Sequence, residues 1–386
     1  MMWTLALFLD LLAQQPPSIP AFDEAMERQL REYQIPGGAL AVAKDGRLVH
    51  ARGYGLADVE SKSPVEADAL FRIASISKPI TAVAVLKLAQ DGKLDLDAKA
   101  FPLLDLDLGK ADPRLVDVSV RQLLEHMGGW DRERSFDPMF RPFDVAAELG
   151  VPLPPSAWDI VRFMTTKPLD FDPGARHAYS NFGYCVLGRI IEKIAGVSYE
   201  DYVLKSVLAP MGITGMRLGK TLAEARAPHE VRYYPLSPQA RPVFPSLKSN
   251  EVPWPYGGFS LEAMDAHGGW LASAPDLVRF ACSIDKVLND RSRAAMLERP
   301  NAQEKGPTYY ACGWMVRPLG PGKRNVWHNG SLPGTSTLLV LRHDGLVWAA
   351  LFNDRSRGEG KIDPALHHAA DAVAEWPAVD LFERLR

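Results

Sequence analysis

Apolar and polar positions divide the chain into a strand-rich beginning, a helical middle and a strand-rich end. Near the beginning, apolar residues recur at helical spacing over residues 22–33 and predict an amphipathic helix. The runs 38–43 and 48–54 flank the turn Lys44-Asp45-Gly46 and predict a β-hairpin. Two strands therefore precede the first segment with candidate chemistry.

Strand patterning returns from Tyr309 onward. The predicted strands are 310–316, 325–329, 335–342 and 347–353, with a turn at His343-Asp344-Gly345 and a closing helix over roughly residues 364–376. Strands at both chain ends with helices between them suggest one mixed sheet into which a helical domain is inserted. We place the sheet-containing part at about residues 20–80 and 262–386 and the helical part at about 81–261.

Three stretches of the helical part break its pattern. Residues 120–129 predict a helix that ends at Gly128 and Gly129. Residues 131–155 are polar, with Pro and Phe interspersed, and predict a long loop that is either a lid or decoration. Residues 225–258 are dense in proline and aromatic residues, so this second loop either walls a substrate cleft or pads the surface.

Composition excludes several classes of protein. The 386 residues are 47% hydrophobic and 24% charged, which suffices for one large core or two joined ones. The net charge is −3 and no basic stripe is interleaved with aromatics, so we expect no nucleic-acid partner. The three cysteines are far apart, which argues against a disulfide framework or a thiolate zinc site. Neither His-Glu-x-x-His nor a dense His/Asp cluster occurs, so we predict no metal and no cofactor.

Residues 1–15 form a short apolar run before Pro16-Pro17. The run resembles a secretory signal with cleavage after Ala13, although it has no Lys or Arg in its first part and carries Asp10 in its apolar core. We predict a periplasmic or secreted protein; the alternative is a cytoplasmic one. In that alternative the segment is a helix docked on the body or lying in a membrane interface. No other stretch is long and apolar enough to span a bilayer.

The first candidate for chemistry is Ser75, three residues before Lys78 at the start of an apolar helical pattern. Positions i and i+3 lie on one helix face, so the hydroxyl and the amine can meet. A lysine accepts the serine proton only if burial or a nearby cation lowers its pKa. Pro79 has no N–H to bond back to Ser75, so regular α-helix should begin after the serine. Taken alone, Ser-x-x-Lys is more often an N-capping serine and a solvated lysine.

Two further motifs offer supporting groups. In Tyr179-Ser180-Asn181, a phenol near an ammonium loses its proton more readily, so Tyr179 could relay protons. Asn181 has a donor and an acceptor for Lys78 or a substrate amide. In His328-Asn329-Gly330-Ser331, Gly330 would let the backbone approach a bound acyl group, and the N–H of Ser331 could face its oxygen. His328 could equally be a structural strand histidine.

In this order, the three motifs resemble the serine β-lactamase and penicillin-binding-protein superfamily, in particular class C β-lactamases, DD-carboxypeptidases, D-aminopeptidases and β-lactamase-like esterases. Further stretches look like landmarks of that family: Leu123-Leu124-Glu125-His126, Phe171-Asp172-Pro173-Gly174, Ala209-Pro210-Met211-Gly212, and Gly268-Gly269-Trp270-Leu271-Ala272-Ser273 before Asp276. The resemblance covers about residues 22–353 and implies an α/β (α+β) fold, with an antiparallel sheet flanked by helices and an inserted all-helical domain.

The resemblance also implies a mechanism. Ser75 would attack an ester or amide carbonyl, with Lys78 and Tyr179 sharing the general-base role. The oxyanion hole would be the backbone N–H groups of Ser75 and Ser331, and no metal or cofactor is implied. Substrates would be small esters, amides or D-amino-acid peptides.

The chain departs from the family twice. His328 stands where the β-lactamases usually have the lysine of Lys-Thr-Gly, so we expect β-lactams to be minor substrates at best. Met127-Gly128 stands where Thr-Ser is common, and we have no physical account of its effect. The alternatives are a β-lactamase or penicillin-binding protein, a Ser-His-Asp hydrolase using His126 or His328, and a non-catalytic peptidoglycan- or lipid-binding relative. The Ser-His-Asp alternative is disfavoured because the chain has no Gly-x-Ser-x-Gly elbow.

Overall fold

The computed structural model describes residues 18–235, 239–301, 306–355 and 360–384. The predicted signal segment 1–15 lies outside the described residues, so export stays a prediction. In the part that is described, none of the helices has the length and apolar character needed to cross a membrane.

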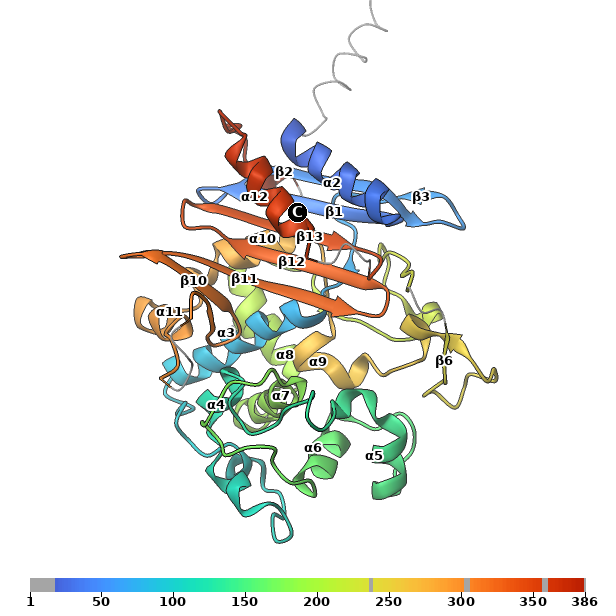
Figure 1. Cartoon of the computed structure of the whole chain (residues 1–386), viewed down its shortest axis with the longest axis vertical. Coiled ribbons are helices and arrows are strands. Elements are labelled where there is room, and N and C mark those ends of the chain that lie inside the picture. The colour runs from blue at the N-terminus through green and yellow to red at the C-terminus, as the bar shows by residue number, and fades with distance from the viewer. Residues whose placement is uncertain (1–17, 236–238, 302–305, 356–359, 385–386) are drawn as a thin grey trace, which may run out of the picture.

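One antiparallel sheet of eight strands forms the upper half of the molecule (Figure 1), in the order β3-β2-β1-β13-β12-β11-β10-β9. Its strands are β1 (Gly37–Lys44), β2 (Arg47–Asp58), β3 (Ser63–Pro64), β9 (Tyr309–Tyr310), β10 (Met315–Gly320), β11 (Lys323–Leu332), β12 (Thr335–Leu341) and β13 (Leu346–Phe352). Strand β1 pairs with β13, so the two chain ends join in one sheet. All pairings in it are antiparallel, which confirms the antiparallel fold class and makes the mixed sheet suggested by the pattern wrong.

The alternation of side chains along β1 separates two cores. Leu40 and Val42 face the core shared with α2 (Pro20–Tyr33) and α12 (Ile362–Asp371), the two helices above the sheet in Figure 1. The alanines that alternate with them, 39, 41 and 43, face the main core on the opposite side. Successive side chains of a strand point to opposite faces, so all three alanines lie on the same face of the sheet. Because they are small, α10 (Ala274–Cys282) packs closely against that face.

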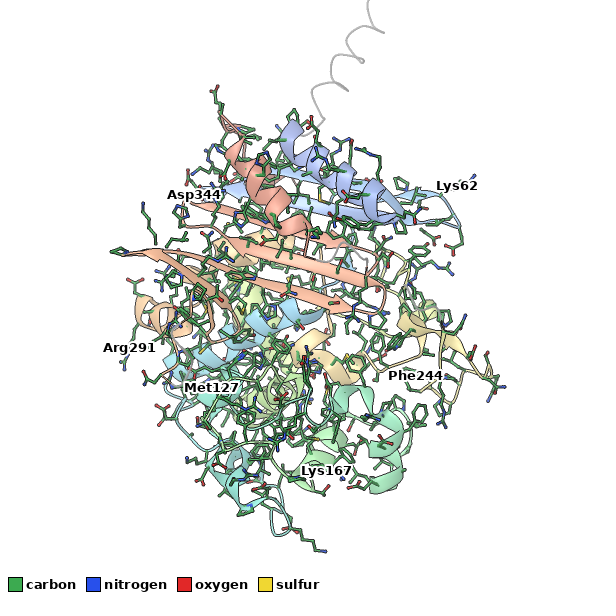
Figure 2. All side chains as sticks on the ribbon, viewed as in Figure 1. Lys62, Met127, Lys167, Phe244, Arg291 and Asp344 are labelled. Carbon is green, nitrogen blue, oxygen red and sulfur yellow. The ribbon has the colours of Figure 1, made fainter. Side chains whose placement is uncertain are left out.

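The helical half lies below the sheet (Figure 1). Its centre is α3 (Ser77–Gln90), which is buried on nearly all sides rather than amphipathic. The other α-helices there are α4 (Val120–Leu124), α5 (Pro142–Leu149), α6 (Ala157–Thr165), α7 (Asn181–Ala195), α8 (Tyr199–Val203), α9 (Asp265–Gly268) and α11 (Asp290–Met296). Figure 2 shows Met127 and Lys167 in this half, and Phe244 in the segment beside the sheet and helices.

Three short strands form a separate sheet beside the serine segment. Strand β8 (Trp270–Ala272) pairs with β4 (Phe71–Arg72), which leads into the serine segment, and with β5 (Arg217–Leu218). Strands β6 (Gln239–Ala240) and β7 (Val252–Pro253) form a separate ribbon in the proline-rich segment. That segment is therefore mostly irregular, as its composition predicts.

Four boundaries differ from the prediction. The predicted strand 310–316 is interrupted between β9 and β10 by a turn in which the Ala311 N–H donates to Trp314 O (2.8 Å) and Gly313 has φ 80°. Helix α4 ends at Leu124, before the glycines, because His126 already takes a left-handed φ of 57°. The predicted loop 131–155 contains the 3₁₀ turn η4 (Pro138–Phe140) and α5. Helix α12 ends at Asp371 rather than near residue 376.

Candidate active site

Ser75 lies in a single 3₁₀ turn, η1 (Ala74–Ile76), directly before α3. Regular α-helix thus begins after the serine, as the position of Pro79 predicts. Ala74 has φ 48°, a left-handed conformation that costs a residue with a Cβ about 1 kcal/mol. Strand β12 holds the carbonyls just before this strained residue, because Thr335 Oγ1 donates to Arg72 O (3.1 Å) and Thr337 Oγ1 to Ile73 O (3.0 Å).

Gly330 brings β11 against the serine turn. A Cβ added at this residue would lie 2.3 Å from both Ile73 O and Thr337 Oγ1 and 3.1 Å from the Cβ of Ala74. The glycine is therefore needed for the strand to pack against the turn that carries Ser75. The prediction attributed it to close approach of a bound acyl group; in the structure, its neighbours are protein backbone and side chain.

Lys78 is fully buried, and its Nζ has three acceptors. They are Ser75 Oγ at 3.0 Å, Asn181 Oδ1 at 2.8 Å and the carbonyl of His267 at 3.0 Å. Burial lowers the pKa of Lys78 well below its usual range, and only the carboxylate of Asp137 opposes it. A neutral Nζ donates two hydrogens, which Asn181 and His267 can take. Its lone pair then faces the hydroxyl of Ser75.

Tyr179 lies beside the same pair of groups. Its ring centroid lies 4.8 Å from Lys78 Nζ. Burial raises the pKa of Tyr179 above its usual value and outweighs the effect of Ser75, which lowers it. The expectation that the lysine makes this phenol lose its proton more readily is therefore not met, because a buried phenolate loses more hydration than the nearby groups restore. In the resting site, Tyr179 is a proton donor.

His328 is a neutral imidazole of one tautomer. Its Nδ1 lies 2.6 Å from its neighbour's carbonyl, Asn329 O, so that nitrogen carries the hydrogen. Its Nε2 lies 3.0 Å from the hydroxyl of Tyr310 and therefore accepts from it. Burial lowers the pKa of His328 to about 3. The lone pair of Nε2 therefore already accepts a hydrogen bond from Tyr310, and the imidazole is uncharged near neutral pH.

His126 packs behind the site and does not reach the serine. Its Nδ1 accepts the backbone N–H of Ser180 at 3.2 Å, and its ring centroid lies 4.2 Å from that of Tyr179. Burial lowers the pKa of His126 well below its usual value. Within the described residues, neither His126 nor His328 hydrogen-bonds to Ser75, so the arrangement lacks the base that a Ser-His-Asp hydrolase requires.

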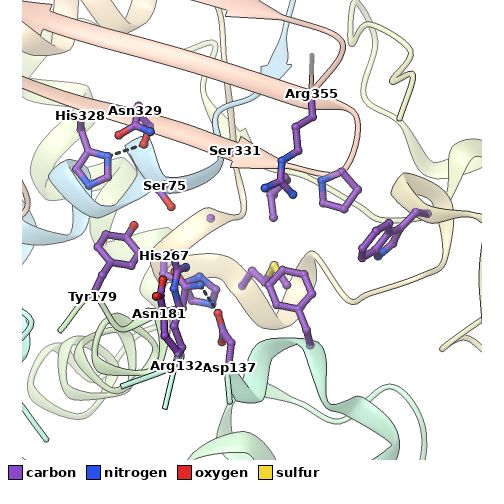
Figure 3. A pocket seen from close by; sticks show the side chains of 17 residues that line it. Ser75, Arg132, Asp137, Tyr179, Asn181, His267, His328, Asn329, Ser331 and Arg355 are labelled. Atoms are coloured by element: carbon purple, nitrogen blue, oxygen red, sulfur yellow. Dashed lines mark hydrogen bonds between the residues drawn. The ribbon is translucent and has the colours of Figure 1, made fainter. Parts of the chain in front are cut away.

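These groups open into a cleft of about 830 Å³ between the sheet and the helical half (Figure 3). Its lining includes the predicted residues Ser75, Tyr179, Asn181, His328 and Ser331. The side-chain oxygen of Ser331 is buried and has no hydrogen-bond partner in the part of the chain that is described. Ser331 lies on β11 directly after Gly330, so its backbone reaches the cleft beside the serine turn.

The structure adds lining residues that the sequence did not single out. They include Arg132, Glu133, Asp137, Phe140, Met264, His267 and Arg355. Four of them come from the segment 131–140, which showed no periodic pattern. Of the aromatic residues in the second predicted loop, Trp254 does wall the cleft, whereas Tyr233 and Tyr256 pack against the buried guanidinium of Arg72 instead.

The side chains that bind metals most often are dispersed. In the described ranges, no group of three or more His, Cys, Asp or Glu residues is placed to hold a metal ion. Cys185, Cys282 and Cys312 are free thiols.

Comparison with protein families finds that the family model described as Beta-lactamase matches residues 22–372. Among curated proteins, the chain is similar to "Protein flp" of Staphylococcus aureus, with 26% identity over 340 residues. That alignment covers 86% of this chain but 62% of the relative, so the chain spans about three-fifths of the relative's length.

Two solved structures show the same fold. The octameric penicillin-binding protein homologue from Pyrococcus abyssi superimposes with a TM-score of 0.72 at 25% identity, covering 94% of this chain and 79% of that one. The D-amino acid amidase from Ochrobactrum anthropi, complexed with D-phenylalanine, superimposes with a TM-score of 0.71 at 24% identity, covering 92% and 98%.

Proposed function

Because the chain belongs to the beta-lactamase family, we propose that it is a serine hydrolase that forms an acyl-enzyme on Ser75. The observation that carries the proposal is the contact of 3.0 Å between Ser75 Oγ and the Nζ of the fully buried Lys78. A lysine in this environment is a base at neutral pH, and the serine is the group that faces its lone pair.

The proposed reaction uses each proton in turn. The neutral amine of Lys78 takes the proton of Ser75 as Oγ bonds to the substrate carbonyl carbon. The oxygen that becomes negative is held by the backbone N–H groups of Ser75 and Ser331. Tyr179, which is protonated, gives its proton to the leaving group, and the ammonium of Lys78 returns one to Tyr179. Water then bonds to the acyl carbon as it loses a proton to Lys78. The bond from that carbon to Ser75 Oγ breaks, and the ammonium of Lys78 returns the proton to Ser75, which frees the carboxylic acid.

The substrate class that we propose is small esters, or amides and D-amino-acid peptides. The neutral ring of His328 attracts a carboxylate less than the lysine ammonium of Lys-Thr-Gly does, which disfavours β-lactams. The fold likeness to a D-amino acid amidase supports amides of D-amino acids as candidates. A β-lactamase or penicillin-binding protein, and a non-catalytic binding relative, are the competing functions.

The test is the intact mass of wild type and of the Ser75→Ala variant after incubation with a fluorophosphonate, a penicillin or a short-chain activated ester, with product release measured alongside. Ser77→Ala is the matched control, since its hydroxyl lies two residues further on, at the start of α3, but accepts the backbone N–H of Trp270. We expect phosphonate labelling and ester turnover in wild type and in the control, but not in Ser75→Ala.

Each competing function gives its own result. A lasting penicillin adduct would indicate a penicillin-binding protein, and penicillin hydrolysis a β-lactamase. Absence of labelling in wild type would favour a binding protein. Ester turnover that survives Ser75→Ala would overturn the mechanism.

A further inference from the structure

A carboxylate from the segment that was predicted to be a loop reaches the lysine of the site through one side chain. Asp137 is the N-cap of η4, and its Oδ1 accepts the backbone N–H of Met139 at 3.2 Å. Its Oδ2 accepts the Nδ2 of Asn181 at 2.6 Å. The Oδ1 of Asn181 in turn accepts from Lys78 Nζ at 2.8 Å. Figure 3 shows Asp137 and Asn181 together below Ser75.

The chemistry of these groups fixes which way the amide of Asn181 points. An ionised carboxylate only accepts hydrogen bonds, so the NH₂ group must face Asp137 and the oxygen must face Lys78. If the amide turned over, its NH₂ would donate to the lone pair of neutral Lys78. That lone pair is the one that has to receive the proton of Ser75, so the turned amide would block the base.

We propose that Asp137 is a positioning residue that holds the amide of Asn181 with its oxygen toward Lys78, and so keeps the amine lone pair available to Ser75. The inference rests on the proposed function and names a residue that neither the motifs nor the comparisons assign. Asp137 touches neither Ser75 nor the lysine; it acts through Asn181.

A second contact keeps Asp137 in place. Two residues further along, the sulfur of Met139 lies 2.8 Å from Nε2 of His267, whose backbone carbonyl is another acceptor of Lys78. Pro138, between them, is buried. The η4 turn therefore contacts both residues that take the two hydrogens of a neutral Lys78, and the carboxylate cannot swing away without disturbing the turn.

Asp137 also contributes charge. Its carboxylate favours the ammonium form and thereby opposes the lowering of the Lys78 pKa, while Arg132 favours the neutral form. The other titratable groups around the lysine come from every element packed on it: His126 after α4, Tyr179 and Tyr184 at α7, His267 on α9 and His328 on β11. Removing the charge of Asp137 should therefore move the titration of Lys78 to lower pH.

The test uses the rate at which a fluorophosphonate labels Ser75, measured by intact mass across pH, because this rate needs no knowledge of the substrate. Asp137→Asn keeps the size of the side chain but removes its charge. The new amide can donate as well as accept, so it no longer forces the NH₂ group of Asn181 to face residue 137. We expect the plateau rate to fall about tenfold, which corresponds to the loss of one hydrogen-bond constraint. We also expect the acid limb of the profile to move to lower pH.

Three variants complete the design. Asp144→Asn makes the same charge change on α5, outside the cleft, and should stay within about twofold of wild type. Asp137→Ala tests loss of the whole contact. In an Asn181→Ala background, Asp137→Asn should have little further effect on the plateau if it acts through that amide.

The outcomes are distinguishable. The inference is overturned, and the proposed function stands, if both Asp137 variants are labelled as fast as wild type. The same holds if Asp137→Asn lowers the plateau rate but leaves the acid limb of the pH profile where it is in wild type. An unlabelled wild type overturns the proposed function and the inference with it. If Asp137→Ala fails to fold, Asp137→Asn decides, provided its thermal midpoint stays within a few degrees of wild type.

Discussion

At the scale of single residues, burial decides the role of each titratable group at the site. The same loss of hydration lowers the pKa of Lys78 and His328 and raises that of Tyr179. These shifts all favour the neutral form of the group concerned. The amine can then accept a proton and the phenol can donate one, whereas the imidazole has its lone pair occupied by Tyr310.

Lys78→Arg tests this assignment. Arginine keeps the charge and several donors but stays protonated at any accessible pH, so it has no lone pair for Ser75. We expect phosphonate labelling and ester turnover to fall by roughly 10² or more. The check is the labelling rate at pH 8 against wild type. The exposed Lys62→Arg serves as control, because its side chain lies far from the cleft, at the edge of the sheet (Figure 2). A rate within threefold of wild type would contradict a neutral lysine base.

At the scale of elements, the serine turn is positioned by strands rather than by its own helix. The hydroxyls of β12 hold the carbonyls before Ala74, and β11 contacts the turn at Gly330. A strand of ordinary residues could not approach so closely.

Gly330→Ala should therefore damage the site more than the fold. The new Cβ overlaps Ile73 O and Thr337 Oγ1, so either the serine turn or β11 must move. We expect a loss of about 1–3 kcal/mol in unfolding free energy, as for other overpacked sites. We expect a loss of labelling of Ser75 that persists at temperatures where the variant is fully folded. Gly306→Ala is the control, because its Cβ would be 3.5 Å from its nearest neighbour. Equal labelling by both variants would show that the strand tolerates the shift.

Arg72 links β4, just before the serine, to the proline-rich segment. Its guanidinium is fully buried and donates to the carbonyls of Pro255 (2.7 Å), Lys220 (2.8 Å) and Thr221 (3.2 Å). It also lies 3.6 Å from the buried carboxylate of Glu230. One residue thus fixes the segment that carries Trp254 into the cleft.

Arg72→Lys should destabilise the protein by about 3 kcal/mol, because one ammonium cannot replace a planar fork at three buried carbonyls. Urea unfolding measures the loss of unfolding free energy, and the exposed Arg291→Lys is the control variant. A change below about 1 kcal/mol would mean that the segment is held chiefly by its aromatic packing.

The elements that the sequence predicted well are those with a clear period. The helix at Phe22 follows the pattern to within two residues, because its apolar residues form one buried face. The hairpin after it follows to within four residues, because its strands are apolar runs separated by a turn. Helix α5 was missed because it has only eight residues, and its start and stop signals, Pro142 and Gly150, stand in a polar segment. The break between β9 and β10 depends on Gly313, whose φ of 80° no strand pattern reveals.

At the scale of the whole molecule, the site joins residues from five distant parts of the chain. The order of three motifs identified Ser75, Lys78, Tyr179 and His328, and the structure brings them together. Ser75, Tyr179 and His328 line one cleft, and Lys78 is buried with its Nζ 3.0 Å from Ser75 Oγ. Asp137 and the carbonyl of His267 could not be found that way. Their role depends on where a turn packs and on which atoms a buried lysine meets, and neither leaves a residue pattern.

Global stability should depend on pH through Glu125, next to the strained His126. Its side chain is buried, 8% exposed as a residue, and burial raises its pKa to about 7 from an ordinary 4.5. The folded state therefore binds this proton more tightly than the unfolded state. The resulting stabilisation is complete below pH 4.5 and is lost as pH rises through about 7. Over the interval from pH 5 to pH 8, this loss amounts to about 2.5 kcal/mol.

Glu125→Gln isolates that contribution, because it resembles the protonated acid and does not titrate. Between pH 5 and pH 8, the unfolding free energy of the variant should rise by about 2.5 kcal/mol relative to that of wild type. Asp354, whose pKa is raised to about 6, and the buried histidines titrate in both proteins and cancel in the difference. Urea unfolding at a series of pH values measures it, with the exposed Glu224→Gln as control. A difference that does not change with pH would mean that water or a local opening hydrates Glu125 in the folded state, and that this carboxyl is not held protonated by the fold.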